Sequence, residues 1–408
     1  MNDALGDDRH GDDAAPGVLT AALVGNGVIA ANHVRALHAT GAAAVTVLVD
    51  PDPDARAVIA AQIAAETDWS APAQFDSLGA ALEASVPDLV VVATPSGTHV
   101  ALALEAVAAG AHVVIEKPLD TTVGKALALR DAAREAATRG QVVSVISQHR
   151  FDPASVVVAD AAHRGHFGRL TSAVASVAWW RSQGYYDSGD WRGTWALDGG
   201  GSTMNQGVHT VDLLVWFLGR PVAVFAYAAT LAHEHIEVED TLAATLRFEG
   251  GAIAVLHTTT SAFPGLSVRI NVHGTKGSAQ IDRDQLEYFY AEPAEGLDPT
   301  VLGDTHADPT RVGPRNLALD LVGAEHVAGA AVAPDAFAQG HRRQYDDILA
   351  AIRDGRAPGV GVDDALLSLA VVRALYVSAA LGREVSVDEV LNGEHDDVIF
   401  DASVPEVA

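Results

Sequence analysis

Short apolar runs alternate with longer Ala-rich stretches in the first third of the chain. Apolar runs without a polar position predict strands that are buried on both faces, as in a parallel sheet. The stretches between them lack internal proline, which favours connecting helices. The predicted strands are 18–24, 45–49, 89–93, 112–115 and 142–146, and the predicted helices are 29–40, 53–66, 100–109 and 123–139. We therefore expect an α/β fold with a doubly wound parallel sheet.

After residue 150, apolar and polar positions alternate with period two. This period predicts strands that bury only one face, and turn residues cluster at 263–265 and 273–277. The predicted strands are 170–179, 222–231, 241–248, 252–260 and 267–273, and the predicted helices are 153–164 and 203–218. We expect a second, α+β domain with an open-faced, mainly antiparallel sheet.

A chain of 408 residues exceeds what one hydrophobic core usually serves, so two domains are expected. The predicted organisation is a disordered acidic tail at 1–16, a first domain at 17–148, a second domain at 149–395 and a C-terminal tail at 396–408. Residues 291–338 show little pattern and predict a surface excursion with one short helix. The last predicted helices, 341–354 and 363–381, are expected to be amphipathic and to pack on one of the domains.

Composition excludes several classes of protein. The sequence contains no run of about 18 uninterrupted apolar residues, so no membrane span is expected. A net charge of −27 without a basic stripe argues against a nucleic-acid partner. The absence of Cys excludes a disulfide scaffold, a thiolate metal site and a cysteine nucleophile. The polar N-terminus lacks an apolar export signal, so we expect a cytoplasmic protein.

A glycine loop follows the first predicted strand directly and opens a helix. It consists of Gly25, Asn26, Gly27, Val28 and Ile29. Backbone N–H groups at such a helix start bind a dinucleotide pyrophosphate, and Asp50 ends the next strand where a carboxylate accepts hydrogen bonds from ribose hydroxyls. Because Asp50 and Asp52 would repel a 2′-phosphate, NAD is favoured over NADP. The alternative is a tight turn without a ligand.

Polar residues also follow the next two predicted strands of the first domain, at the sheet edge where ligands of such sheets bind. They are Thr94, Pro95, Ser96 and His99 after one strand, and Glu116, Lys117 and Pro118 after the other. Lysine is rare, since Lys117 is accompanied only by Lys125 and Lys276. This makes Lys117 a candidate catalytic residue rather than an ordinary surface lysine.

The order of these motifs resembles the Gfo/Idh/MocA family of sugar and cyclitol dehydrogenases, and the resemblance spans roughly residues 18–385. Further matching residues are His33, Gly199, Gly200, Gly201, Asn205, Gly207, His209, Asp212, Glu239, Asp240, Thr241, Gly274, Thr275, Lys276 and Gly277. The resemblance implies an N-terminal Rossmann dinucleotide-binding domain, an open-faced sheet domain and an active site between them. It also implies that Lys117 and His209 are catalytic.

One position departs from the family pattern, because Asn205 occupies the place of the family's catalytic aspartate. An amide cannot take a proton at neutral pH, so we expect Asn205 to orient a ligand and His209 to act as the base. Positions i and i+4 share a helix face, and an ammonium at Lys117 would stabilise developing alkoxide charge. A hydrogen-bonded core histidine is the alternative for His209. His33 and His99 are expected to shape loops rather than to move protons.

Trp, Tyr and Arg residues concentrate between 179 and 195. Such residues could bind a polyhydroxylated ring, and the alternative is that they form a subunit interface or a core cluster. Arg150 could contact a ligand or carboxylates of its own chain. We expect substrate contacts from Lys117, Arg150, Trp180, Arg181, Tyr186, Trp191, Asn205 and His209. We expect cofactor contacts from Gly25, Asn26, Gly27, Val28, Ile29, Asp50, Thr94, Pro95, Ser96, His99, Glu116 and Lys117.

No metal is expected, because His233 and His235 lack a third ligand at a typical spacing and read as polar surface. The sequence predicts an NAD-dependent oxidoreductase that moves a hydride at a secondary alcohol carbon of a sugar, sugar derivative or cyclitol. An enzyme that retains its NAD through a redox cycle and a non-catalytic NAD-binding regulator are the alternatives. An open apolar sheet face needs cover, so a homodimer or homotetramer is expected.

Overall fold

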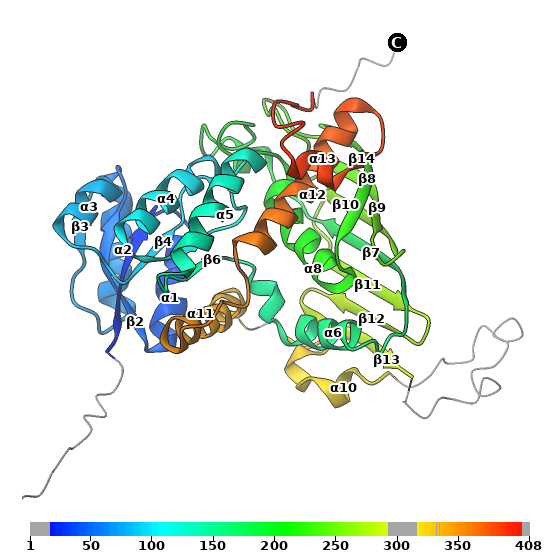
Figure 1. Cartoon of the computed structure of the whole chain (residues 1–408), viewed down its shortest axis with the longest axis horizontal. Coiled ribbons are helices and arrows are strands. Elements are labelled where there is room, and N and C mark those ends of the chain that lie inside the picture. The colour runs from blue at the N-terminus through cyan, green and yellow to red at the C-terminus, as the bar shows by residue number, and fades with distance from the viewer. Residues whose placement is uncertain (1–16, 293–315, 332, 334, 402–408) are drawn as a thin grey trace, which may run out of the picture.

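The computed structural model describes residues 17–292, 316–331, 333 and 335–401. In these residues two sheets stand side by side, with helices between and around them (Figure 1). The predicted N-terminal tail, the middle of the predicted excursion and the last seven residues of the predicted C-terminal tail lie outside the described residues.

The first sheet is parallel throughout, with the strand order β3-β2-β1-β4-β5-β6. Its strands are β1 (Leu19–Val24), β2 (Ala43–Val49), β3 (Ala73–Phe75), β4 (Leu89–Val92), β5 (His112–Ile115) and β6 (Val143–Val145). Its helices are α1 (Ala30–Thr40), α2 (Pro53–Glu66), α3 (Leu78–Ala84), α4 (His99–Ala109) and α5 (Val123–Ala137). The predicted doubly wound sheet is confirmed. Strand order reverses between β1 and β4, where the carboxyl ends of the strands leave a crevice for a ligand.

The second sheet has the order β13-β12-β11-β7-β10-β9-β8-β14 and is antiparallel except where β7 pairs with β10. Its strands are β7 (Leu170–Ala178), β8 (Pro221–Ala229), β9 (Thr241–Phe248), β10 (Ile253–Thr259), β11 (Val268–Gly274), β12 (Gly277–Asp282), β13 (Gln285–Ala291) and β14 (Val385–Ser386). Helices α6 (Pro153–His163) and α8 (Val208–Leu218) cover one face (Figure 1). The other face carries exposed apolar side chains, including Tyr227, Ile253 and Val255. The predicted open-faced sheet is therefore confirmed.

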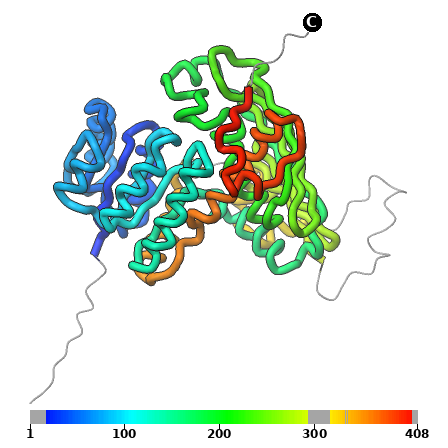
Figure 2. Tube along the Cα trace, turned by 45° about the horizontal axis from the view of Figure 1, so that its top comes forward, coloured from blue at the N-terminus to red at the C-terminus, as the bar shows by residue number. Residues whose placement is uncertain are grey.

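The C-terminal helices do not all belong to the second sheet. Helix α11 (Ala336–Asp354) packs against α1, and its Tyr345 and Ile348 enter the apolar core of the first sheet. The chain thus returns to the first domain after residue 335, where α11 lies beside α1 (Figure 1). In the turned view, the orange trace again lies against the teal part of the first domain (Figure 2).

Helix α12 (Val362–Leu381) packs on β8, α8 and α5, so it lies between the two sheets. It was expected to be amphipathic, but it is buried on nearly all sides because both sheets contact it. Its length and composition would suffice to cross a membrane, and most of it is buried inside the protein, as in a core helix.

Short elements complete the described fold: α7 (Gln183–Tyr186), α10 (Ala318–Leu321) and α13 (Val387–Leu391). Helix α10 is the short helix expected in the excursion. Residues 396–401 were predicted as part of a tail, yet Phe400 is buried and the Asp396 carboxylate accepts a hydrogen bond from the Gly124 N–H. These residues therefore pack on the protein.

Candidate active site

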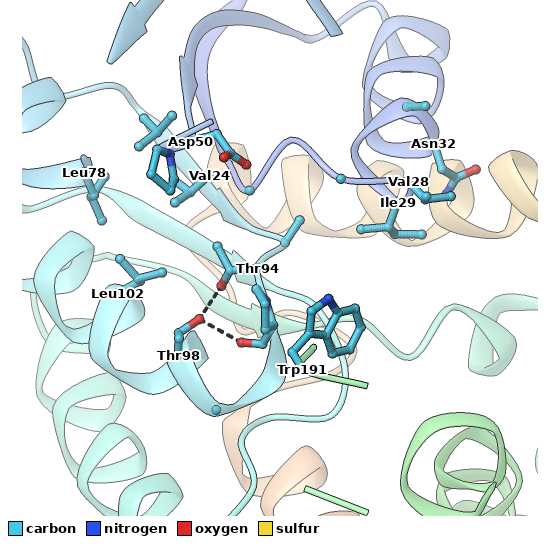
Figure 3. Close-up of a pocket in the computed structure, with 18 of the residues that line it drawn as sticks. Val24, Val28, Ile29, Asn32, Asp50, Leu78, Thr94, Thr98, Leu102 and Trp191 are labelled. Carbon is cyan, nitrogen blue, oxygen red and sulfur yellow. Dashed lines mark hydrogen bonds between the residues drawn. The ribbon is translucent and has the colours of Figure 1, made fainter. Parts of the chain in front are cut away.

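A cleft of about 1630 Å³ opens at the carboxyl ends of β1, β2 and β4 (Figure 3). The predicted cofactor residues that line it are Gly25, Gly27, Val28, Ile29, Asp50, Thr94 and Pro95. Across from them, Arg181, Tyr185, Trp191 and Arg192 enter from the second domain. Asp335 and Phe337, at the start of α11, form a further wall of the cleft that sequence pattern did not predict. Both domains therefore form the cleft.

Gly25 sets the close approach of the glycine loop to β4. Its φ of +87° favours glycine, and a Cβ at this position would lie 2.6 Å from the Ala93 carbonyl oxygen. The backbone N–H groups of Gly27, Val28 and Ile29 have no acceptor among the described residues. Free donors at the start of α1 are suited to an anion such as a pyrophosphate.

The Asp50 carboxylate is fixed at the edge of the cleft. Its Oδ2 accepts a hydrogen bond from the Asn26 N–H at 2.7 Å, and its Oδ1 accepts one from the Asp52 N–H at 2.9 Å. The Asn26 side chain is buried and donates to the Leu23 carbonyl, so it shapes the loop instead of facing the cleft. The Arg56 guanidinium donates to the backbone carbonyl of Asp50, a nearby cation that sequence spacing did not bring to notice.

Two predicted cofactor contacts, Ser96 and His99, are buried behind the cleft. The His99 ring nitrogens lie 2.8 Å from the carbonyl oxygens of Pro118 and Thr94, so this side chain joins the loops that follow β4 and β5. Burial lowers the pKa of His99. Thr94 itself reaches the cleft, where its hydroxyl is 2.7 Å from that of Thr98. His99 supports the site from within the protein, as expected for a residue that shapes loops.

Glu116 does not reach the cleft either. Its Oε1 lies 3.1 Å from His33 Nε2 and 3.2 Å from His341 Nε2, and its Oε2 accepts the Lys117 N–H at 3.0 Å. Burial opposes ionisation, but the hydrogen bonds from the two histidines hold the pKa of Glu116 well below its usual range. His33 also contacts the Tyr345 hydroxyl at 2.8 Å. This buried cluster ties α1 and α11 to the end of β5 and so fixes the backbone of Lys117.

Lys117 and His209 border one small void of about 10 Å³ behind Pro118, separate from the lining of the large cleft. The Lys117 ammonium donates to the backbone carbonyl of Asn205 at 3.1 Å. Burial lowers the pKa of Lys117. Burial, together with the positive charges of Lys117 and His149, lowers the pKa of His209 well below 6.5. His209 is therefore neutral at physiological pH and able to accept a proton.

His149 is a charged neighbour of His209 that sequence reasoning missed. The two rings are 4.9 Å apart between centroids and nearly perpendicular. Burial disfavours its charged form, but Asp284 at 3.2 Å and Asp152 at 2.7 Å raise the pKa of His149 well above 6.5. Asp284 belongs to the β12–β13 turn, and no local pattern at residue 149 indicates that partner.

Asn205 lies in a π-helical turn, Thr203–Gly207, that leads into α8. Its Nδ2 donates to Asp198 Oδ1 at 2.8 Å and to the Gly200 carbonyl at 3.1 Å, which uses both amide hydrogens. Its Oδ1 has no donor among the described residues and is left as an acceptor. Asp198 Oδ2 accepts the Gly193 N–H at 2.8 Å, and burial raises the pKa of Asp198. Asp198 thus supplies, next to Asn205, the carboxylate that position 205 lacks, and no local sequence pattern predicted it.

Glu239 holds the start of this helical segment. Its carboxylate accepts hydrogen bonds from the N–H groups of Gly201 and Thr203 at 2.9 and 2.8 Å, and from the Tyr376 hydroxyl at 3.1 Å. A Cβ on Gly201 would lie 1.7 Å from the Glu239 carbonyl oxygen, so the glycine run permits this contact. The family-like glycine and Glu-Asp-Thr motifs therefore position Asn205 and His209.

Three predicted substrate contacts lie elsewhere. Arg150 is buried between Asp212 at 2.7 Å and Asp364 at 3.0 Å, so carboxylates of its own chain occupy it. Tyr186 is buried with its hydroxyl 2.8 Å from Thr260 Oγ1. Trp180 is exposed against Phe263, outside the lining of the cleft.

His233 and His235 were both expected on the polar surface, but their surroundings differ. His233 is partly buried, and its side chain is 5% exposed, with Nδ1 at 3.0 Å from Asp240 and Nε2 at 2.9 Å from the Arg181 carbonyl. His235 is exposed. The surface assignment is wrong for His233, because Asp240 lies within reach to pair with it.

Two protein-family models match the chain. An oxidoreductase-family model for the NAD-binding Rossmann fold, GFO_IDH_MocA, matches residues 19–146, and the GFO/IDH/MocA C-terminal domain matches residues 156–280. The inositol 2-dehydrogenase 2 of Paenarthrobacter aurescens is 29% identical over 274 residues, which are 65% of this chain and 75% of that protein. The levoglucosan dehydrogenase of Pseudarthrobacter phenanthrenivorans is 26% identical over 233 residues, 50% of this chain and 59% of that protein.

A solved structure is similar over nearly its whole length. The WlbA dehydrogenase from Bordetella pertussis, crystallised in complex with NADH and UDP-GlcNAcA, is 30% identical. The similarity covers 90% of this chain and 97% of that chain, with a TM-score of 0.74.

Proposed function

Because the chain belongs to the GFO/IDH/MocA family of NAD-dependent dehydrogenases, we propose that it transfers a hydride between NAD and a secondary alcohol carbon of a sugar, sugar derivative or cyclitol. Relatives named for inositol and levoglucosan, and one crystallised with a nucleotide sugar, support this substrate class. The observation that carries the proposal is the pairing of Lys117 with a neutral His209 at one void.

The residues around the cleft fit a bound NAD. The free N–H groups of residues 27–29 would hold the pyrophosphate, and the Asp50 carboxylate would accept hydrogen bonds from the adenosine ribose. Ser96, His99 and Glu116 would support this site from behind. When bound, NAD supplies the acceptor or donor of the hydride.

The residues of the chain then handle the proton. The substrate hydroxyl proton would pass to the imidazole of His209 as the carbinol carbon gives up its hydride. The Lys117 ammonium would donate a hydrogen bond to the same oxygen and stabilise its developing negative charge. The free Oδ1 of Asn205 would accept a hydrogen bond from a neighbouring substrate hydroxyl and so orient the ring.

The test is a spectrophotometric screen of purified protein with NAD against hexoses, uronates, anhydrosugars, glycosides and inositols. On the best substrate, Lys117→Met and His209→Ala should each lower kcat/KM by at least about 10²-fold, the lower end for general acid and base groups. NADH binding should persist, because the glycine loop supplies it. Lys276→Met is the matched control, since Lys276 is exposed and pairs with Glu292.

Other outcomes separate the alternatives. Substrate conversion without net NADH release would indicate a retained cofactor. Near-wild-type turnover of Lys117→Met would contradict the mechanism, and an NAD-binding regulator would then be the better reading. We further propose a cytoplasmic homodimer or homotetramer that covers the open face of the second sheet, where Tyr227 and Ile253 are exposed.

A further inference from the structure

Arg181 and Arg192 face the cleft without a carboxylate partner among the described residues. Most other described arginines in this acidic chain lie within reach of an Asp or Glu, as Arg150 does with Asp212. Two guanidinium groups without a carboxylate partner, at one side of a ligand cleft, therefore stand out in a protein with a net charge of −27.

Aromatic rings hold both guanidinium groups. Arg181 lies 4.8 Å from the Tyr185 ring centre and 5.0 Å from that of Trp179. Arg192 lies 4.3 Å from the ring centres of Tyr185 and Trp191. Stacking orients the planar group but uses none of its five N–H donors. Arg192 Nε also donates to Ser188 Oγ at 3.1 Å. Both side chains are thus ordered, while the other four donors of Arg192 and those of Arg181 have no acceptor among the described residues.

The Arg181 backbone is anchored as well. Its N–H donates to the Thr260 carbonyl at 2.8 Å, and its carbonyl is 2.9 Å from His233 Nε2. His233 in turn pairs with the buried Asp240. The Arg181 side-chain Nε is buried and has no partner among the described residues. An unsatisfied buried donor of this kind is costly unless a ligand or an ordered water accepts its hydrogen bond.

Both guanidinium charges also act on residues around the separate void that Lys117 and His209 border. The Arg181 charge contributes, after burial, to the lowered pKa of Lys117, and the Arg192 charge acts on Asp198, which contacts Asn205. Asp50, by contrast, ends β2 on the first-domain side of the cleft. Arg181 and Arg192 thus line the cleft from the second domain, whereas Asp50 lines it from the first.

We propose that Arg181 and Arg192 bind an anionic group of the substrate, so that the preferred sugar carries a carboxylate or a phosphate. Guanidinium donors match either group in a bidentate geometry. The inference rests on the proposed function, since it names the substrate class of that site. The pyrophosphate of NAD is the other anion that could reach these donors, and the experiment distinguishes the two.

The test measures binding instead of turnover. NADH-loaded protein is titrated calorimetrically with matched neutral and anionic sugars: glucose and glucuronate, galactose and galacturonate, and N-acetylglucosamine and its 1-phosphate. At least one anionic member should bind more tightly than its neutral partner, with an advantage that shrinks as salt is added. Arg181→Met and Arg192→Met should each reduce that advantage by about 10- to 100-fold, as expected for a hydrogen bond between charged groups.

Arg169→Met is the control, because Arg169 is exposed and outside the cleft lining. It should leave the preference intact. The proposal is overturned if no anionic sugar binds better than its neutral partner, or if the Arg181 and Arg192 variants weaken NADH binding instead. An anionic sugar that binds in this titration but reduces no NAD in the spectrophotometric screen would contradict the dehydrogenase mechanism and leave this recognition site standing.

Discussion

Replacing Asp198 by Asn tests how Asn205 is held. In the protein, Asp198 accepts two hydrogen bonds on different oxygens, one from the Asn205 amide and one from the Gly193 N–H. An amide at position 198 has only one oxygen, so it can satisfy one of these donors and must present N–H to the other. Asp198→Asn therefore loses the hydrogen bond from the Asn205 amide or the one from the Gly193 N–H.

The structure sets the expected size of the effect. The lost contact is a 2.8 Å hydrogen bond to a buried carboxylate. Such bonds contribute about 1.5–3 kcal/mol, which corresponds to roughly 10- to 150-fold in a rate or equilibrium constant. Because Asn205 orients substrate in the proposed mechanism, we expect kcat/KM to fall within that range. NADH binding should be unchanged, since the glycine loop is untouched.

The assay compares Asp198→Asn, Asn205→Asp and the double variant in steady-state turnover and thermal unfolding. Asn205→Asp puts two carboxylates in contact, so one must hold a proton and the pKa of the pair rises. Its stability should fall as pH rises through that raised pKa.

In the double variant, an amide at position 198 can donate to Asp at 205 and still accept from Gly193, so part of the activity should return. Return stays partial because the new carboxylate faces the Gly200 carbonyl. Asp190→Asn, a change in an exposed loop carboxylate, is the control. Unchanged kcat/KM in Asp198→Asn would refute the reasoning, as would a double variant that recovers nothing over Asn205→Asp.

Three further predictions follow. Asp50→Ala should reduce the preference for NAD over NADP, mainly by weakening the binding of NAD, as measured by fluorescence titration. If the wild-type protein prefers NADP, with Arg56 near the site, then the assignment of Asp50 to the ribose is wrong. The value of kcat/KM should persist as pH falls through 6.5, because burial and cationic neighbours lower the pKa of His209. His149→Ala removes one of these cations, so the acidic limb of the profile of kcat/KM against pH should move to higher pH. An unmoved acidic limb would argue against coupling between His149 and His209. Val255→Asp, on the open sheet face, should shift the mass measured in solution toward the monomer, and a wild-type monomer at micromolar concentration would contradict the oligomer proposal.

The sequence predicted best where neighbouring residues decide the structure. The glycine loop, Asp50 and the apolar strands of the first sheet are read from local pattern, and the structure places them at one sheet edge. Strand β3 was missed because a three-residue strand is too short to show a period.

Contacts between distant segments were not predictable in the same way. Arg150 pairs with Asp364, which lies 214 residues away, so its occupation by carboxylates could not be read from its own surroundings. His149 owes its charge to Asp284 in a distant turn, and Asp198 gains its role only because the chain folds back on Asn205. The hydrophobic pattern of a sequence identifies which residues face inward, but it does not identify the distant residues with which they form ion pairs or hydrogen bonds.

The return of α11 to the first sheet bears on how the chain matures during synthesis. Tyr345 and Ile348 fill the core beside α1, and Gln344 bonds the backbone at Val145 and Ser147. The ribosome delivers these residues after strands β7 to β13 of the second sheet. The first domain therefore emerges first, but its core is completed only after α11 has been synthesised. Until then, an apolar side of α1 is exposed. A fragment ending near residue 148 should consequently aggregate or recruit chaperones.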